Sequence, residues 1–332
     1  MCGIVGYIGE NQAVPVLLNG LSKLEYRGYD SAGISVYHDG IHTIKVKGKL
    51  AGLREKVEKD DKKSSHIGIG HTRWATHGVP NEINSHPHNS QNGKISVVHN
   101  GIIENYLELK NMLIEKGYTF KSETDTEVVA QLFEDLYDGD MVSTTRKLLE
   151  KIRGAYAQGI MCTDHPDTLV AVRKDCPLLI GLGKGENYIA SDIPALLEYT
   201  RDYYLLETNE IAVLKNDGVK LYDIDGKEIK KEVYHVTWDI AAAEKGGYDY
   251  FMMKEIMEQP EALKKTIQPR VTESGIHLED VSLTEEEIKN CGRIHIVACG
   301  SAMHAGVVGR YVIEETCRIP VEVDIASEFR YR

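Results

Sequence analysis

A cysteine at position 2 opens the first strand-like segment of this chain. The residues Met1-Cys2-Gly3-Ile4-Val5-Gly6 continue through apolar residues to Ile8, a pattern typical of a short buried strand. Removal of Met1 would leave a thiol and a free α-amine on one residue. An α-amine, with a pKa of about 7.7–8.0, can accept the thiol proton without a further side chain. We therefore interpret Cys2 as a nucleophile held at the start of a buried strand rather than as part of a frayed terminus.

The composition excludes several classes of protein. The 332 residues suggest about two domains, and the net charge of −12 comes without any Lys/Arg-rich block. A nucleic-acid surface is therefore not expected. No apolar run reaches the ~18–20 residues of a membrane span, and the N-terminus lacks signal-peptide features. The six cysteines show no paired spacing, which indicates reduced thiols. We expect a cytoplasmic protein without a membrane or nucleic-acid partner.

Short strands and tight turns dominate residues 3–230. Turn signals of the hairpin type occur at His38-Asp39-Gly40, Asn216-Asp217-Gly218 and Asp225-Gly226. Helices are expected between the strands, one of them starting with a capping box in which Thr124 caps and Glu127 reaches back. Strands on both sides of a helical block predict stacked antiparallel sheets covered by helices.

The pattern changes beyond residue 234. A helix around Met252–Met257 is expected to stop at Gln259-Pro260. An apolar strand at 293–298, a helix at 302–316 and a strand at 321–326 then form one βαβ unit, an element of a parallel sheet. One such unit leaves both sheet edges open, so we expect the chain to stop inside its second domain.

Four further clusters bear on the role of Cys2. Arg73 follows the strand 67–70 and can grip a carboxylate with two parallel hydrogen bonds. The Asn100 amide and the Gly101 backbone N–H follow another strand and can both donate to one developing oxyanion. Asp125, in the first turn of a helix, can pair with a substrate amine, although stabilisation of the helix dipole also explains it. The polar loop 26–33 is interpreted as a brace. Together these groups describe a free amino acid held for attack on its side-chain carbonyl, which is glutamine amide hydrolysis.

At these positions the chain resembles the glutaminase half of the family of isomerising glutamine–fructose-6-phosphate aminotransferases, also called glucosamine-6-phosphate synthases. The resemblance extends from end to end of the chain. Its matching stretches are Cys2–Gly6, Leu24–Gly33, His71–Gly78, Val98–Glu104, Ser122–Glu127, Met253–Pro260, Ala298–Gly300 and Ala326–Arg332.

The resemblance implies a fold and a set of roles. The fold class would be α+β: an αββα sandwich of the N-terminal-nucleophile hydrolases (class II glutamine amidotransferases), followed by an incomplete α/β sugar-isomerase (SIS) domain. Cys2 would be the nucleophile, with Asn100 and Gly101 as the oxyanion hole. Arg73, Thr76, His77 and Asp125 would form the glutamine site, Trp74 would gate an ammonia path, and Gly300 and Ser301 would contact the sugar phosphate.

The implied organisation is a glutaminase domain at 2–230, a linker with helices at 231–284 and a truncated sugar-isomerase domain at 285–332. The full-length enzyme would supply ammonia from L-glutamine to fructose 6-phosphate in amino-sugar and UDP-GlcNAc biosynthesis, as a homodimer and without a cofactor. This chain alone would keep only the glutaminase activity. One departure is Ser301-Ala302, where the family usually has Thr-Ser, and it is expected to weaken phosphate binding.

Alternative interpretations remain open at this point. The nearest enzyme rival is glutamine phosphoribosyl-pyrophosphate amidotransferase, which shares the N-terminal cysteine. A different class is a catalytically silent, sugar-phosphate-binding regulator. The histidines at 71, 77, 86, 88 and 99 could suggest a metal, but no Cys or carboxylate stands at ligand spacing, so no metal site is expected.

Overall fold

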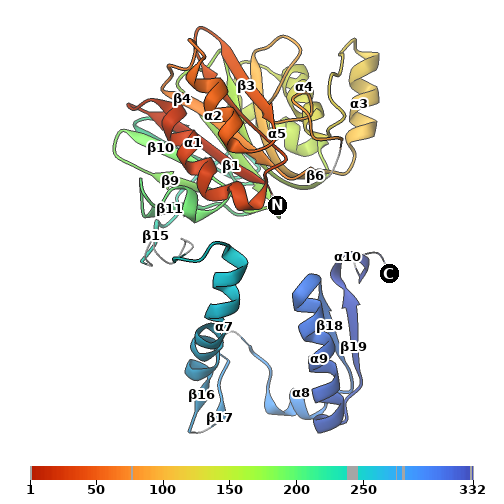
Figure 1. Cartoon of the computed structure of the whole chain (residues 1–332). Coiled ribbons are helices and arrows are strands. Elements are labelled where there is room, and N and C mark those ends of the chain that lie inside the picture. The colour runs from red at the N-terminus through yellow and green to blue at the C-terminus, as the bar shows by residue number, and fades with distance from the viewer. Residues whose placement is uncertain are drawn as a thin grey trace. The chain divides into compact units, whose positions relative to one another are not determined.

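The computed structural model describes residues 2–75, 78–237, 246–273, 275–278, 281–329 and 331. The chain divides into two compact units, residues 1–246 and 247–332, and each is described by itself. Within the described residues, the first unit contains two sheets with helices on both sides (Figure 1).

The first sheet has the strand order β15-β11-β9-β10-β1-β4-β2-β3, and its pairs are antiparallel. Its strands are β1 (Gly3–Gly9), β2 (Ser31–Tyr37), β3 (Ile41–Lys47), β4 (Ile67–Arg73), β9 (Leu179–Leu182), β10 (Glu186–Ala190), β11 (Asp202–Leu205) and β15 (Tyr234–His235). The predicted strand after Cys2 is thus confirmed as β1, which is buried along its whole length. Strand β15 lies beyond residue 230 and still pairs with β11 in this sheet.

The second sheet has the order β14-β13-β12-β8-β7-β6-β5. Its strands are β5 (His88–Asn89), β6 (Ile95–Ile103), β7 (Gly154–Cys162), β8 (Leu169–Lys174), β12 (Ile211–Lys215), β13 (Gly218–Tyr222) and β14 (Glu228–Ile229). The three predicted hairpin turns all join neighbouring strands: β2 to β3, β12 to β13 and β13 to β14.

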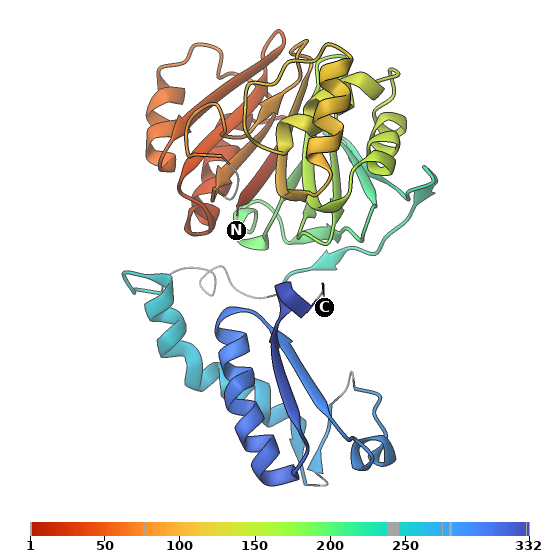
Figure 2. The same ribbon diagram turned by 90° about the vertical axis from the view of Figure 1, so that its right-hand side faces the viewer.

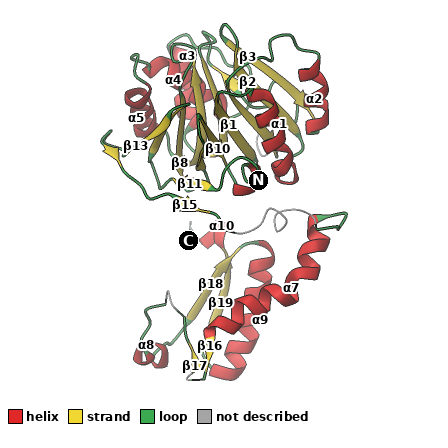
Figure 3. Cartoon of the chain, turned by 90° about the vertical axis from the view of Figure 1, so that its left-hand side faces the viewer, coloured by secondary structure: helices red, strands yellow, loops and turns green. Residues whose placement is uncertain are grey.

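The core consists of three apolar layers. Helices α1 (Ala13–Leu24) and α2 (Leu50–Glu58) cover the outer face of the first sheet, and neither was predicted from the sequence. Helices α3 (Tyr106–Glu115), α4 (Thr126–Leu136) and α5 (Met141–Lys151) cover the second sheet. Between the sheets lie residues such as Ile4, Ile69 and Val98. Figure 3 shows the two helical layers on opposite sides of the strands, so the predicted αββα sandwich is confirmed.

The second unit contains α7 (Phe251–Ile267), β16 (Val271–Thr272), β17 (Gly275–Ile276), α8 (Glu285–Lys289), β18 (Ile294–Ala298), α9 (Gly300–Cys317), β19 (Val321–Ile325) and α10 (Ala326–Phe329). Strands β18 and β19 are parallel and α9 packs along them (Figure 2), which confirms the predicted βαβ unit. The predicted helix stop at Pro260 is wrong, because α7 continues through it to Ile267. This helix is mostly exposed, so water can take the backbone carbonyl that proline leaves without a donor.

Candidate active site

The Cys2 thiol contacts the backbone just after the end of a neighbouring strand. Strands β1 and β4 pair with Gly3 opposite Thr72, which brings Cys2 beside the residues that follow β4. The Cys2 Sγ accepts a hydrogen bond from the Trp74 backbone N–H at 3.2 Å. Burial raises the pKa of the thiol above its usual value. The thiol is therefore protonated near neutral pH, and any attack by its sulfur requires a base.

Asn100 and Gly101 reach Cys2 from the opposite sheet, where both lie in β6. The Asn100 Nδ2 donates to the Cys2 backbone oxygen at 3.1 Å. Gly101 has a φ of +123°, and a Cβ at this position would collide with the Ala155 carbonyl oxygen. Only glycine therefore fits here. Gly101 lies opposite Tyr156 in the β6–β7 pairing and lines a cavity together with Cys2.

A narrow cavity joins the thiol to two buried charged groups. Its lining consists of Cys2, Arg73, Trp74, His86, His99, Gly101, Thr124, Asp125 and Thr126. Arg73 is only 4% exposed and Asp125 only 6%. Burial lowers the pKa of Arg73, and the nearby carboxylates of Asp125 and Asp30 oppose that shift. A buried cation and a buried anion in one cavity with a thiol are suited to a zwitterionic ligand.

The Asp125 carboxylate is oriented by the neighbouring strand. Its Oδ2 accepts a hydrogen bond from the Ile103 backbone N–H at 2.8 Å. Asp125 is the N-cap residue of α4, but its side chain makes no capping hydrogen bond to that helix. The carboxylate is therefore turned toward β6 and the cavity rather than toward the N–H groups of its own helix.

The predicted capping box at this helix start is wrong. Helix α4 begins at Thr126 with Asp125 as its N-cap residue, one residue later than predicted. The Thr124 hydroxyl pairs with the His88 Nε2 at 3.1 Å. The Glu127 carboxylate accepts from the backbone N–H groups of Lys121 and Ser122. The chain before the helix folds back toward Glu127, so these two N–H groups replace the expected one.

A second cavity of about 270 Å³ shares Cys2, Trp74 and Gly101 with the first. Its other lining residues are Arg27, Asn100, Ile102, Cys176 and Pro177. The Trp74 side chain is 45% exposed and packs edge-on against Tyr29, with ring centroids 5.4 Å apart. Arg27 and Cys176 were not predicted as site residues; Arg27 lies in the loop identified as a brace, whereas nothing in the sequence around Cys176 signals this position.

The loop 26–33 does brace the segment that carries Arg73 and Trp74. The Asp30 Oδ2 accepts from the Ala75 backbone N–H at 2.8 Å, and the Asp30 N–H donates to the Arg73 carbonyl at 3.0 Å. Gly28 lies so close to the Arg73 backbone that a Cβ would stand 2.8 Å from its carbonyl carbon. The contacts of Gly28 and Asp30 therefore hold the backbone of residues 73–75, which contains the N–H group that donates to the Cys2 sulfur.

Four histidines at the cavity are buried. His86 and His99 line it, and His71 and His88 each contact the His86 ring. Burial lowers the pKa of each, to about 3 for His71, so all four are neutral near pH 7. In the part of the chain that the structure describes, no group of three or more His, Cys, Asp or Glu side chains is arranged to hold a metal ion.

Six of the predicted site residues thus line the two cavities: Cys2, Arg73, Trp74, Asn100, Gly101 and Asp125. Thr76 and His77 lie outside the described residues. Gly300 and Ser301 belong to the second unit, where they are exposed at the start of α9 and Gly300 has a φ of +60°.

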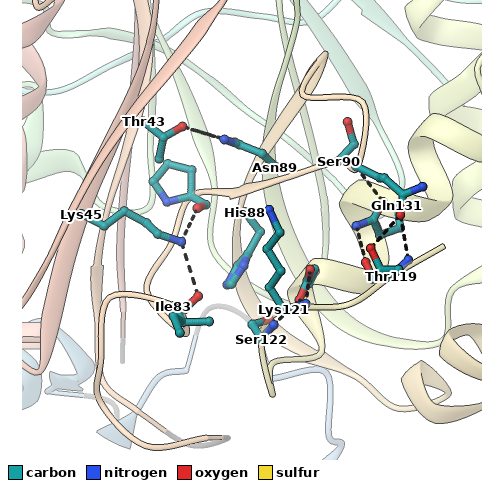
Figure 4. Close-up of a pocket in the computed structure, with 13 residues that line it drawn as sticks. Thr43, Lys45, Ile83, His88, Asn89, Ser90, Thr119, Lys121, Ser122 and Gln131 are labelled. Atoms are coloured by element: carbon teal, nitrogen blue, oxygen red, sulfur yellow. Dashed lines mark hydrogen bonds between the residues drawn. The ribbon is translucent and has the colours of Figure 1, made fainter.

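A larger cavity, of about 510 Å³, contains none of the predicted residues (Figure 4). Two of its polar side chains already have partners within the protein. The Lys45 ammonium donates to the backbone carbonyls of Ile83, Ser85 and Pro87, and the Asn89 amide donates to the Thr43 hydroxyl at 2.9 Å. Among the described residues its lining contains no cysteine, so the cavity is not a candidate for the thiol chemistry.

Comparison with known proteins agrees with this geometry. Residues 71–198 match the glutamine amidotransferase domain family. Proteins named glutamine–fructose-6-phosphate aminotransferase [isomerizing] align with the whole chain. The identity is 60% for that of Caldanaerobacter subterraneus subsp. tengcongensis, 49% for that of Methanosarcina mazei and 48% for that of Thermus thermophilus. The chain covers 55%, 56% and 54% of these relatives, so it spans about half of their length.

Two solved structures share the fold. One is described as the allosteric regulatory enzyme of purine biosynthesis, with 27% identity, a TM-score of 0.60 and coverage of 67% of this chain and 49% of that one. The other is glutamine phosphoribosylpyrophosphate amidotransferase from B. subtilis, with 21% identity, a TM-score of 0.61 and coverage of 97% and 65%. A helix suited to crossing a membrane does not occur among the described residues. The chain thus contains a glutamine amidotransferase domain, and along its whole length it is similar to about half of the length of the proteins named glutamine–fructose-6-phosphate aminotransferase [isomerizing].

Proposed function

We propose that this chain hydrolyses free L-glutamine through a Cys2 thioester and that the longer protein delivers the ammonia to fructose 6-phosphate, giving glucosamine 6-phosphate and glutamate. One observation carries the proposal. The thiol of Cys2, the guanidinium of Arg73 and the carboxylate of Asp125 line one cavity. A thiol, a carboxylate partner and an ammonium partner are what binding and attack of a free amino acid require.

In the first half-reaction the α-amine of Cys2, freed by removal of Met1, takes the thiol proton. The sulfur then attacks the side-chain amide carbon of glutamine. The resulting oxyanion accepts hydrogen bonds from the Asn100 amide and the Gly101 N–H. Collapse of this intermediate breaks the C–N bond, the departing nitrogen takes the proton from the α-amine, and ammonia leaves behind a γ-glutamyl thioester.

In the second half-reaction water attacks the thioester carbon while the α-amine takes a proton from it. The same two donors stabilise the second oxyanion, and its collapse returns the thiol and releases glutamate. Arg73 holds the substrate carboxylate and Asp125 its ammonium group in both steps. Thr76 and His77 complete the glutamine site in this proposal, and Trp74 borders the route by which ammonia leaves.

The remaining parts of the proposal rest on the family resemblance alone. They are the sugar-isomerase identity of the second unit, a sugar-phosphate contact at Gly300 and Ser301, a homodimer of the longer protein and a cytoplasmic location. An amidotransferase acting on phosphoribosyl pyrophosphate is the weaker alternative. The relatives that match the whole chain at 48–60% identity carry the aminotransferase name, whereas the B. subtilis amidotransferase at 21% identity shows a common fold only.

The test is a glutaminase assay on the purified chain, with intact mass measured to verify the removal of Met1. We expect glutamate and ammonia in equal amounts. Cys2→Ala is expected to abolish hydrolysis, and so is an N-terminal tag that remains attached. Cys176→Ala is the matched control, because it removes a second thiol that borders the same cavity. Full activity of a protein whose tag is verified intact would contradict the role of the α-amine, and an inactive parent chain would favour the silent regulator.

A further inference from the structure

The side-chain amide of Asn100 is held from the side opposite Cys2 by a buried histidine. In strand β4, the His71 Nε2 lies 3.0 Å from the Asn100 Oδ1 and 3.1 Å from the backbone oxygen of His99. A backbone carbonyl can only accept a hydrogen bond, so the His71 Nε2 has to carry the proton. One N–H shared between two acceptors is a common arrangement. The Asn100 atom that faces His71 must therefore be its oxygen.

The other end of the same amide leads to the same orientation independently. The Asn100 Nδ2 lies 3.1 Å from the backbone oxygen of Cys2, another group that can only accept. A flipped amide would set its NH₂ group against the His71 N–H and its oxygen against the Cys2 carbonyl. Both contacts would then be repulsive. In the observed orientation one hydrogen of the NH₂ group is donated to the Cys2 backbone oxygen. The second hydrogen can be donated to a ligand in the cavity that Asn100 lines.

His71 is itself kept in place and in its neutral form. Its ring is 1% exposed and stacks on the His86 ring, with centroids 4.1 Å apart and an interplanar angle of 20°. Its Nδ1 is buried without a hydrogen-bond partner in the described part of the chain. A proton on Nδ1 would therefore be a buried donor with nothing to bond, in agreement with the strong lowering of the His71 pKa by burial.

We propose that His71 is a positioning residue for the oxyanion hole: its Nε2–H binds the Asn100 oxygen and so turns the Asn100 NH₂ group toward the reacting carbonyl. This inference rests on the glutaminase function proposed above, and it adds a residue that touches neither substrate nor thiol. Loss of the Nε2–H removes one of the two contacts that favour this amide orientation and leaves only the Cys2 carbonyl to hold it. The donor is then misdirected in a larger share of the molecules. The effect belongs to the oxyanion steps rather than to substrate binding.

Two amide substitutions separate this role from simple packing. The amide NH₂ of a glutamine reaches about as far as the imidazole Nε2, whereas that of an asparagine reaches only as far as Nδ1. We expect His71→Gln to keep kcat for glutamine within about threefold of the parent. His71→Asn is expected to lower kcat about tenfold, a usual effect of one lost hydrogen bond, with KM changed less than twofold. Alkylation of Cys2 by iodoacetamide forms no oxyanion, so its rate should be the same in both variants.

A double-mutant cycle with Asn100→Ala completes the test. Once the Asn100 amide is gone, adding His71→Asn is expected to cause no further fall in kcat. If the two effects multiply instead, or if His71→Asn retains the parent's kcat, this inference is overturned while the glutaminase function stands. A fall in kcat of equal size for His71→Gln and His71→Asn also overturns it, because that pattern reports packing. A parent chain without glutaminase activity overturns both proposals.

Discussion

At the scale of single residues, the Asn100 amide donates one hydrogen to the Cys2 backbone oxygen and lines the cavity that contains the thiol. Loss of one oxyanion donor typically costs about 10²–10³ in turnover. We therefore expect Asn100→Ala to lower kcat by that factor with little change in KM. Asn105→Ala is the control, because the Asn105 side chain bonds only to the backbone of Lys151 and Arg153 among the described residues. Steady-state kinetics on both variants decide the matter, and a fall in kcat of less than threefold for Asn100→Ala would refute the role.

The buried Arg73 guanidinium, proposed to pair with the α-carboxylate of glutamine, leads to a prediction about substrate selection. Removal of one partner from a desolvated charge pair costs about 2–5 kcal/mol. Since about 1.4 kcal/mol corresponds to a tenfold change, Arg73→Ala is thus expected to raise KM for glutamine by a factor of about 30 or more. For the unmutated chain, glutamine whose α-carboxylate is converted to an amide should be a poor substrate. Comparable kcat/KM for glutamine and its α-amide would exclude a role of Arg73 in selecting the carboxylate.

At the scale of elements, Lys45 binds the segment between β4 and β5 through three hydrogen bonds to its backbone carbonyls. The Lys45 ammonium, in β3, donates to the carbonyls of Ser85 at 2.7 Å and Pro87 at 3.2 Å, which flank His86. Burial lowers the pKa of Lys45 to about 8. Lys45→Met leaves these carbonyls without a donor and is expected to lower the free energy of unfolding by about 1–3 kcal/mol.

Lys47→Met is the matched control for this measurement, because Lys47 lies on the same strand and is exposed. Urea denaturation of both variants should show a change well below 1 kcal/mol for Lys47→Met, as is usual for exposed sites. Equal stabilities of the two variants would mean that the contacts of Lys45 with the segment are not important for stability.

At the scale of the whole molecule, every described residue assigned to glutamine chemistry lies in the first unit. The second unit offers, among its described residues, a parallel pair of strands with one helix packed along it. With glutamine and fructose 6-phosphate supplied together, this chain is therefore expected to form glutamate and ammonia but no glucosamine 6-phosphate. Chromatography of the products tests this, and glucosamine 6-phosphate above the non-enzymatic background would contradict it.

The buried histidines make the free energy of unfolding of the first unit depend on pH. The pKa of His71 is about 3 in the folded chain, against about 6.5 when unfolded. Below pH 6.5 the unfolded chain binds the proton and the folded chain does not, so stability present above pH 6.5 is lost as the pH falls toward 3. For His71 alone the loss at pH 5 is about 2 kcal/mol. Denaturation at pH 7 and pH 5 should show a smaller loss for His71→Gln than for the parent, and identical losses would refute this linkage.

The sequence by itself determined the elements whose signals are local. The apolar run after Cys2 became β1, the turn residues at 38–40 became a hairpin, and the segment 293–326 became a βαβ unit. Cys2, Arg73 and Asp125 could be selected because each stands at or next to the end of a recognisable strand or helix. Asn100 was selected as a residue that follows a strand, and that expectation is wrong because β6 continues to Ile103. These features depend on propensity and periodicity over a few neighbouring residues, which a linear pattern preserves.

Only the tertiary structure decided which groups meet across the sandwich. The Asn100 amide finds Cys2 and His71, which lie 98 and 29 residues away in the chain, and Glu127 bonds to Lys121 and Ser122 instead of completing a capping box. Cys176 reaches the second cavity with no sequence signal at all. The hydrogen-bond partner of a side chain depends on which segments pack against it and on which competing donors remain available after burial. Both depend on the folded structure and not on spacing along the chain.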